Sequence, residues 1–302
     1  MQFLNYKDIF QNKVKSKNVL ITGSSGYVGG QLVEIFKDLN CNLIGIDKEP
    51  LNSSIEEFSL NLVDSINTKK ILDSFKPDLI FHAGTNSAQH YKSDLLKSFN
   101  EDYHSISNIF NYISSRDTKF VYYSSSYVYS GVKGKVSEDN VNNPVHNFGL
   151  GKRFFEQLIL RKINNPLIFR LSSVIGNGYA RQPNAIKELI SEIERTNRLT
   201  IWGDGNRKMQ YIPINDVLSA SLLAYEAKDK LYNLGADDYL SLSQVASIFE
   251  KISNCEVKYD HNKAEGETLP FMINNKLKHE LNFDFTNVIE FINNYYSNTK
   301  RE

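Results

Sequence analysis

Three glycines stand directly after a short apolar run near the start of the chain. The run covers 19–22, and the glycines are Gly23, Gly26 and Gly29. Glycines let the backbone turn tightly and approach a pyrophosphate, and the N-terminus of a following helix presents N–H groups that attract anions. This GxxGxxG spacing predicts a dinucleotide-binding turn, with a glycine-rich turn without ligand as the alternative. The cofactor-binding residues predicted from it are Gly23, Ser25, Gly26, Tyr27, Val28 and Gly29.

A carboxylate follows this turn at the spacing that ribose recognition requires. Asp47 ends the second apolar run, 43–47, about 20 residues after the glycines. A carboxylate there accepts hydrogen bonds from the adenosine ribose hydroxyls and repels a 2′-phosphate, which favours NAD over NADP. Asp64 lies farther along and is predicted to contact the adenine edge. A helix N-cap accounts for Asp64 equally well.

The elements that would position these residues alternate along the first half of the chain. Short apolar runs predict strands at 19–22, 43–47, 79–82, 120–124 and 166–171, and amphipathic stretches predict helices at 27–39, 64–75, 102–114 and 151–163. This alternation predicts an α/β fold, a Rossmann-type doubly wound parallel sheet.

The second half of the chain has a less regular pattern. It predicts strands at 199–202 and 211–214 and helices at 242–252 and 285–295. We therefore expect residues 1–173 to form mainly the NAD-binding Rossmann domain. Residues 174–302 are expected to form a smaller C-terminal substrate lobe, interleaved with the last Rossmann strands.

Composition excludes several classes of function. The 302 residues carry 35 Lys plus Arg and 35 Asp plus Glu, so no overall field favours nucleic acid or an anionic membrane. The two cysteines, Cys41 and Cys255, have no metal-ligand or disulfide-framework spacing, so no metal site is predicted and a reducing compartment fits best. Polar residues interrupt the first eight positions, and no apolar run of about 18 residues occurs. We expect a cytoplasmic protein.

Beyond these patterns, the chain resembles the extended short-chain dehydrogenase/reductases, a family that includes nucleotide-sugar epimerases, dehydratases and 4-ketosugar reductases. The resemblance covers nearly the whole sequence and implies a nucleotide-sugar substrate. The segments that carry it are 23–29, 81–84, 121–129, 148–152, 170–178, 201–205 and 232–235.

The family's catalytic tyrosine is replaced in this chain. Family members place a Tyr four residues before a Lys on one helix, beside a Ser or Thr. The ammonium favours the phenolate, which takes the proton of a sugar hydroxyl as hydride passes to the nicotinamide. Lys152 and Ser125 match the Lys and the Ser, and Lys152 would also bind the nicotinamide ribose. The Tyr position is Phe148, which has no proton to exchange.

Three explanations of Phe148 stay open at this point. In the first explanation, the natural protein has a tyrosine there and this chain carries a Tyr→Phe change made to trap a complex. Alternatively, another group transfers the proton, the nearest in sequence being His146, Tyr127 and Tyr129. In the third explanation, the protein binds NAD without catalysis.

The resemblance also narrows the reaction. Family members that remove water across C5 and C6 carry an acidic pair after the Ser or Thr, and here those positions are Ser126 and Tyr127. A dehydratase is therefore disfavoured, which leaves a 4-epimerase or a 4-ketosugar reductase. NAD suits an epimerase, because the hydride removed is returned to the same intermediate.

The expected diphosphate site departs from the family pattern. The position of the usual Arg after the 203–205 turn is Met209, with Arg207 or Lys208 as substitutes. The substrate-binding residues predicted are Ser126, Asn177, Arg181, Arg207 and Lys263. The helices at 102–114 and 151–163 match those that form an intersubunit four-helix bundle in many relatives, which implies a homodimer.

Overall fold

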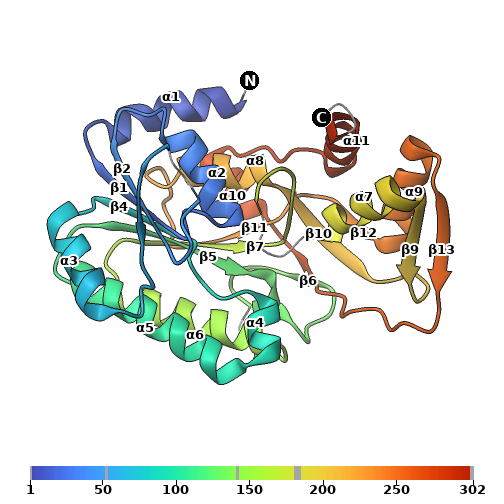
Figure 1. Cartoon of the computed structure of the whole chain (residues 1–302), viewed down its shortest axis with the longest axis horizontal. Coiled ribbons are helices and arrows are strands. Elements are labelled where there is room, and N and C mark those ends of the chain that lie inside the picture. The colour runs from blue at the N-terminus through green and yellow to red at the C-terminus, as the bar shows by residue number, and fades with distance from the viewer. Residues whose placement is uncertain (1, 52–53, 141–142, 180–184, 300–302) are drawn as a thin grey trace.

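A computed structural model describes residues 2–51, 54–140, 143–179 and 185–299. Its main feature is a seven-stranded parallel sheet in the order β11-β7-β5-β4-β1-β2-β3 (Figure 1). These strands are β1 (Asn18–Thr22), β2 (Asn42–Asp47), β3 (Glu56–Ser59), β4 (Leu79–His82), β5 (Lys119–Ser125), β7 (Pro166–Leu171) and β11 (Leu231–Leu234). Strand β1 pairs in parallel with β2 on one side and with β4 on the other. Successive strands are therefore added first on one side of β1 and then on the other, so the strand order reverses between β1 and β4. The α/β doubly wound fold predicted from the sequence is confirmed.

The central strands are buried on both faces, which explains their continuous apolar sequences. In β1, Val19 and Ile21 face one layer of core, and Leu20 faces the other. In β5, Phe120 and Val121 divide in the same way.

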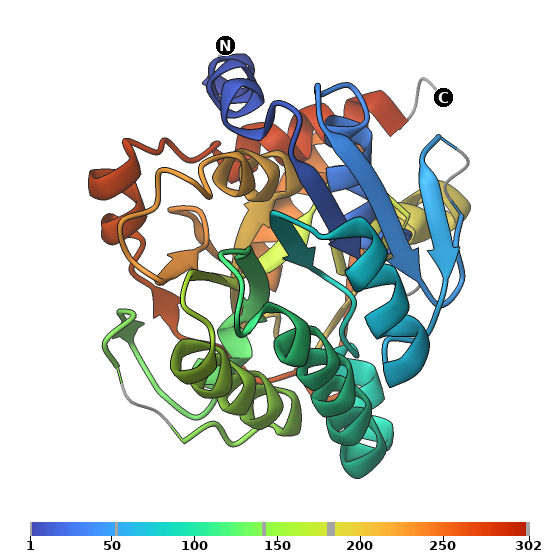
Figure 2. The same ribbon diagram turned by 90° about the vertical axis from the view of Figure 1, so that its left-hand side faces the viewer.

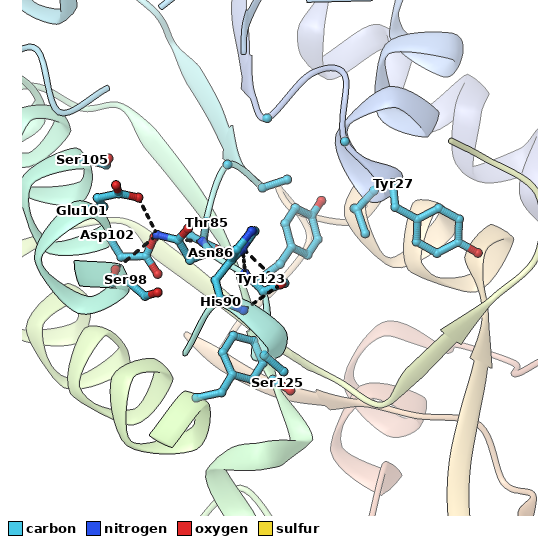
Figure 3. A pocket seen from close by; sticks show the side chains of 18 of the residues that line it. Tyr27, Thr85, Asn86, His90, Ser98, Glu101, Asp102, Ser105, Tyr123 and Ser125 are labelled. Carbon is cyan, nitrogen blue, oxygen red and sulfur yellow. Dashed lines mark hydrogen bonds between the residues drawn. The ribbon is translucent and has the colours of Figure 1, made fainter. Parts of the chain in front are cut away.

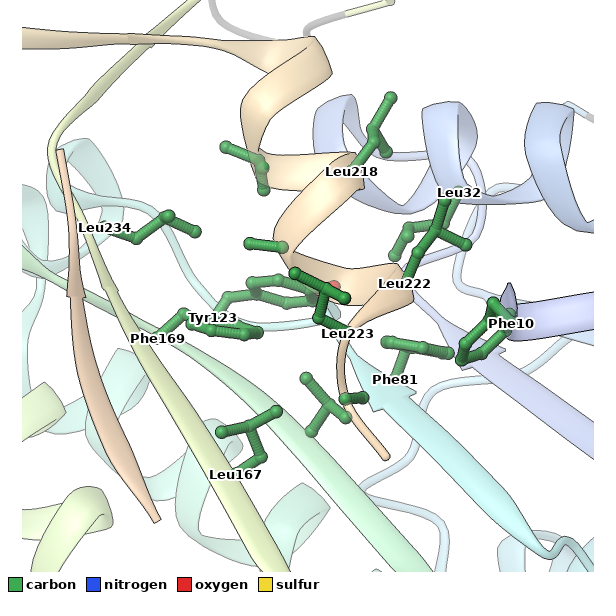
Figure 4. Packing of buried hydrophobic residues seen from close by; sticks show 14 of the residues in the cluster. Phe10, Leu32, Phe81, Tyr123, Leu167, Phe169, Leu218, Leu222, Leu223 and Leu234 are labelled. Carbon is green, nitrogen blue, oxygen red and sulfur yellow. The ribbon is translucent and has the colours of Figure 1, made fainter. Parts of the chain in front are cut away.

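One face of the sheet is covered by α2 (Tyr27–Phe36), α8 (Ile214–Leu222) and α1 (Gln2–Val14) (Figures 1 and 2). Figure 4 shows Leu218 and Leu222 of α8 packed between the sheet and α2. The segment before β1, expected to be a polar leader, is a helix. Phe10 and Val14 of α1 are buried in this layer, and Phe10 contacts Phe36 edge-on at 5.3 Å.

The opposite face is covered by α3 (Ser65–Phe75), α5 (Leu95–Ile113) and α6 (Asn147–Lys162), with the short α4 (Ala88–Ser93) at one end. Two of these helices begin earlier than predicted. Helix α5 starts at Leu95, because the Asp94 carboxylate accepts the Lys97 N–H at 3.0 Å. Helix α6 starts at Asn147 after a cap by His146, although its first turns contain glycine, which lowers helix propensity.

A smaller lobe adjoins the carboxyl ends of the strands. Its strands are β8 (Ser173–Ile175), β9 (Arg198–Trp202), β10 (Lys208–Pro213), β12 (Tyr239–Ser241) and β13 (Glu256–Asp260), and its helices are α7 (Ala185–Thr196), α9 (Leu242–Ser253) and α11 (Val288–Thr299). They enclose a separate core. The pair β6 (Lys135–Val136) and β14 (Phe271–Met272), the single turn η1 (Ser126–Tyr129) and α10 (Asn275–Leu281) complete the structure.

The smaller lobe is interleaved with the sheet, because α8 and β11 come late in the chain yet belong to the large layered unit. The division at residue 173 remains a prediction. Over the described ranges, no helix combines the length and apolar character needed to cross a membrane.

A buried ion pair joins α6 to the ends of β5 and β7. The Arg170 guanidinium donates to both carboxylate oxygens of Glu156, at 2.9 and 2.7 Å, and neither residue is more than 1% exposed. Ser124 donates to the same carboxylate at 2.6 Å, and Arg170 also donates to the Tyr129 hydroxyl. Burial acts to lower the pKa of Arg170, but the hydrogen-bonded Glu156 carboxylate outweighs it and raises that pKa, so Arg170 stays protonated.

Replacing Arg170 by methionine should destabilise the fold strongly. Arg170→Met leaves Glu156 as a buried charge, for which a cost of about 3–5 kcal/mol is expected. The matched control is Arg198→Met, because Arg198 pairs with Glu256 at 3.0 Å on an exposed surface. The control should cost under about 1 kcal/mol. Urea unfolding with linear extrapolation measures both, and equal losses would contradict the importance given to the buried pair.

Candidate active site

A cavity of about 940 Å³ opens at the carboxyl ends of the parallel strands. It extends from Asp47 at the end of β2 to Lys152 and Phe148 on α6. Tyr27, Thr85 and Ser125 are among the residues that line it (Figure 3). The segments that follow β1, β4, β5 and β7 all contribute to its wall. Ligands of doubly wound sheets bind at this edge, where the strand order reverses.

The glycine turn after β1 is shaped by close backbone contacts. Gly23 has a φ of +68°, and a Cβ there would lie 2.6 Å from the backbone of Gly84. A Cβ on Gly29 would lie 2.0 Å from the Gly23 carbonyl oxygen. Gly23, Gly26, Tyr27 and Val28 line the cavity, and α2 begins at Tyr27. The backbone, cleared of side chains beside a helix N-terminus, fits a dinucleotide pyrophosphate.

Two residues predicted from the same motif do not line this cavity. The Ser25 hydroxyl donates to Glu57 at 2.8 Å and accepts the Leu51 N–H at 2.7 Å, so it faces the protein. Gly29 is buried beneath the turn. Both residues help to shape the turn, and neither contributes to the surface of the cavity.

Asp47 and Asp64 have different surroundings. Asp47 is buried, and its carboxylate accepts the N–H groups of Ser25 at 3.2 Å and Glu49 at 3.0 Å while lining the cavity. Asp64 instead caps α3 by accepting the Asn67 N–H at 3.0 Å, and this bond lowers its pKa. Asp64 does not line the cavity, so the structure favours the cap over the predicted adenine contact. Asn61 and Leu62 line the cavity instead, which the sequence analysis missed.

Lys152 lies at the other end of the cavity, and its ammonium is held in place. Its Nζ donates to the Thr85 hydroxyl at 2.8 Å and to the Tyr123 carbonyl at 2.9 Å. Burial lowers the pKa of Lys152 to about 8, against the opposing effect of the carboxylates of Asp102 and Glu156. Lys152 therefore loses its proton at a pH closer to 7 than an exposed lysine does.

Phe148 and Ser125 lie beside Lys152, as the spacing predicted. The Lys152 Nζ is 5.4 Å from the centre of the Phe148 ring. That ring meets the rings of Tyr91 and Tyr127 edge-on, at centroid distances of 5.5 and 5.8 Å. Ser125 lines the same cavity from the end of β5, and its hydroxyl accepts the Tyr127 N–H at 3.3 Å. The phenyl ring thus lies against the cation in the cavity that Ser125 also lines, and it offers no hydroxyl.

The sequence analysis missed a polar network in the wall of the cavity, where Asn86 and Asp102 lie. The Asp102 carboxylate accepts the Asn86 backbone and side-chain N–H groups at 2.9 and 3.0 Å (Figure 3). It also accepts the Tyr91 hydroxyl at 2.9 Å. Burial raises the pKa of Asp102, which nearby Lys152 opposes. A charged residue on the buried side of an amphipathic helix was the available signal.

A second pocket, of about 150 Å³, adjoins the cavity. Ser125, Ser172 and Ser173 line both spaces, so the two spaces share this part of their walls. From the smaller lobe the pocket receives Arg207, Met209, Gln210, Leu269 and Pro270, and from η1 it receives Ser126 and Tyr127. Of the residues predicted to bind substrate, Ser126 and Arg207 therefore lie here.

The other predicted substrate contacts lie elsewhere. Lys263 is half-exposed, with its Nζ 4.9 Å from the centre of the Trp202 ring, and it lines neither space. Asn177 is exposed and also lines neither. Arg181 lies outside the described residues. Arg207 donates to the Glu267 carbonyl at 3.0 Å, which holds its side chain against the chain's own backbone. Among the described residues, no group of three His, Cys, Asp or Glu side chains could hold a metal ion.

Comparison with known proteins places this geometry in a family. The model of the NAD dependent epimerase/dehydratase family matches residues 19–235. The chain is 24% identical over 194 residues to methionine adenosyltransferase 2 subunit beta of Xenopus laevis, covering 61% of this chain and 55% of that protein. It therefore spans little more than half the length of this relative. It is 25% identical over 257 residues to a putative UDP-glucose 4-epimerase of Methanocaldococcus jannaschii, covering 77% of this chain and 81% of that protein.

Solved structures agree in fold. The UDP-glucose 4-epimerase of Thermotoga maritima, solved with UDP-glucose, has a TM-score of 0.85 at 17% identity and covers 94% of this chain and 99% of its own. The family match takes in the glycine turn, Asp47, Ser125 and Lys152, the residues that meet around the large cavity. The chain belongs to the NAD dependent epimerase/dehydratase family.

Proposed function

We propose that the protein converts a nucleotide-activated sugar at C4 with NAD, as a 4-epimerase or a 4-ketosugar reductase. One observation carries this proposal: Ser125 lines both a cavity suited to a dinucleotide and a pocket that reaches the smaller lobe. A sugar carbon held in the pocket would therefore lie next to a cofactor held in the cavity, beside Ser125. A relative described as a putative UDP-glucose 4-epimerase supports the same reaction class.

The side chains of the large cavity fit NAD. The glycine turn would take the pyrophosphate, and Asp47 would accept the adenosine ribose hydroxyls. Lys152 would bind the nicotinamide ribose. When bound, the nicotinamide ring supplies the hydride acceptor and donor. A solved relative described with UDP-glucuronic acid and NAD, from Bacillus cereus, supports this cofactor.

The remaining site residues would act on the sugar. The Ser125 hydroxyl would orient the reacting oxygen, and Arg207 would face the diphosphate from the smaller lobe. We extend this to the organisation of the chain, with residues 1–173 mainly holding the cofactor and 174–302 mainly the substrate. Ser126 and Tyr127 stand where an acidic pair would serve dehydration, which makes a dehydratase the less favoured enzyme.

We also propose a homodimer built on α5 and α6, which lie side by side on the outer surface (Figure 1). Apolar side chains along these helices are exposed, namely Leu96 at 73%, Leu150 at 46%, Phe154 at 43% and Tyr103 at 39%. Phe99 contacts both Tyr103 and Phe154, so the aromatic rings form one patch. A contiguous apolar patch of this kind is typical of a protein interface, and a second copy would cover it.

A second candidate is a binding role without catalysis. Phe148 removes the usual proton-transferring group, and Met209 stands at the position of a phosphate-binding arginine. The similarity to a protein described as a subunit of methionine adenosyltransferase fits this candidate. In that role the cavity would hold a dinucleotide while another surface meets a partner protein.

Restoring the phenol tests the enzymatic proposal directly. Phe148→Tyr should raise the rate of sugar-alcohol oxidation at C4 by on the order of 10²–10⁴, the usual contribution of a positioned acid–base group. NADH absorbance and sugar products would be followed with NAD and a panel of nucleotide sugars. Phe154→Tyr, on the exposed side of the same helix, is the matched control and should change nothing. If the unchanged chain and Phe148→Tyr both bind NAD and neither binds or converts any sugar, a binding role without catalysis is the better account.

The carboxylate at the end of β2 should control cofactor affinity. Asp47→Asn should weaken NAD binding by roughly 10–100-fold, because a charge-assisted hydrogen bond contributes about 1.5–3 kcal/mol. It should also narrow the preference for NAD over NADP. Calorimetric titration measures both affinities, with Asp64→Asn as the control that should bind NAD normally. An equal loss in the two variants would contradict the assignment of the ribose site to Asp47.

The aromatic patch should set the oligomeric state. Phe154→Glu should convert a dimer into a monomer, because a buried unpaired charge at an interface costs several kcal/mol. Light scattering after gel filtration gives the mass. Tyr259→Glu, on an exposed aromatic of β13, is the control and should leave the dimer intact. A monomer in the unchanged chain would disprove the proposed interface.

A further inference from the structure

Phe148 leaves open which group exchanges a proton with the sugar, and most hydroxyls nearby are engaged elsewhere. Tyr91 donates to Asp102 at 2.9 Å, and Tyr123 is hydrogen-bonded to Ser221 at 2.7 Å. The Tyr129 hydroxyl donates to the Asn233 amide oxygen at 2.8 Å and accepts a hydrogen bond from the Arg170 guanidinium. All three rings are buried and have structural partners.

The two nearest imidazoles are also partly engaged. His146 caps α6, and its Nδ1 accepts the Phe148 N–H at 3.2 Å. His146 lines neither the cavity nor the pocket. His90 lines the large cavity, and its Nδ1 accepts the Ser87 N–H at 3.2 Å as part of a helix cap. His90 is therefore the main competitor for the role.

Tyr127 differs from all of these groups. It is half-buried and lines the small pocket together with Ser125. Its ring meets Phe148 edge-on at 5.8 Å and lies 4.5 Å from the His146 ring. Within the described part of the chain, its hydroxyl has no hydrogen-bond partner. The Tyr127 hydroxyl thus makes no structural hydrogen bond, and its ring lies next to Phe148, which stands where the family has its catalytic tyrosine.

We propose that Tyr127 is the catalytic acid of this site and donates the proton that a ketosugar oxygen takes up on reduction. The inference rests on the proposed function and deepens it. Hydride from NADH forms the C–H bond at the carbonyl carbon, and the C=O π electrons move to the oxygen. That oxygen takes the proton of the Tyr127 hydroxyl, and the phenolate regains a proton from water.

The placement of Tyr127 favours this direction of reaction. A tyrosine hydroxyl brings its own proton to the site, so it can protonate an alkoxide without activation. Oxidation of a sugar alcohol needs a phenolate, which the family obtains by placing an ammonium beside the phenol. Here the Lys152 ammonium lies against Phe148 and makes no contact with Tyr127. We infer that the chain as it stands acts as a ketosugar reductase.

Single-turnover reduction by the NADH-loaded protein tests the proposal, with UDP-linked and dTDP-linked 4-keto-6-deoxyglucose as probes. Tyr127→Phe should slow reduction by at least about 100-fold, the contribution of a positioned acid. The rate in the unchanged chain should fall in D₂O, and this isotope effect should be lost in Tyr127→Phe. Binding of UDP, measured by calorimetry, should stay within about twofold. Tyr259→Phe, at an exposed tyrosine of β13, is the matched control and should behave as the unchanged chain.

A double variant separates a catalytic from a structural role. In the Phe148→Tyr background, Tyr127→Phe should have little effect, because the restored phenol transfers the proton. Three results would overturn the proposal: an unchanged chain no faster than Tyr127→Phe, an equal loss in both backgrounds, or a loss confined to His90→Gln. Activity of Phe148→Tyr together with any of these would leave the proposed function standing. Failure of all variants to bind UDP would count against the proposed function itself.

Discussion

The buried ion pair between Arg170 and Glu156 is the constraint on which the site depends. It connects β7, which is followed by Ser172 and Ser173, with β5, which ends in Ser125, and with α6, which carries Lys152. Charges buried this deeply persist only when each is fully paired, so the three elements have one relative position. The serines and the lysine are placed by that pair and by the sheet, without depending on mobile loops.

The same arrangement makes the replacement at 148 easy to accommodate. The ring lies among Tyr91, Tyr127 and the Lys152 ammonium, contacts that a phenyl group satisfies as well as a phenol does. Packing at this position therefore does not require a hydroxyl group. Only proton transfer would require one. Stability and acid–base function are separable here, which is why the family's fold accommodates Phe148.

Sequence reasoning predicted the features that depend on local pattern. The alternating buried strands, the glycine turn and Asp47 follow from periodicity and spacing. The grouping of Ser125, Phe148 and Lys152 was implied by the family resemblance. It failed where several local interpretations compete. Asp64 satisfies a cap as well as a ligand, and only the fold shows Asn61 at the cavity. Lys263 and Arg207 are both cations near one turn, yet the packing of the 260–270 segment puts only Arg207 at the pocket. Asp102 was missed because its partners, Asn86 and Tyr91, lie on a different segment of the chain.

The wall shared by the two spaces has a consequence for ligand binding. Ser125, Ser172 and Ser173 touch both, so a ligand on one side fixes side chains that the other ligand must meet. The two binding free energies are then linked, and by reciprocity each ligand changes the affinity of the other by the same factor. A dinucleotide already in place would form part of the surface that the sugar meets. Cofactor and sugar are therefore expected to bind in a coupled manner, each with an affinity that depends on whether the other is in place.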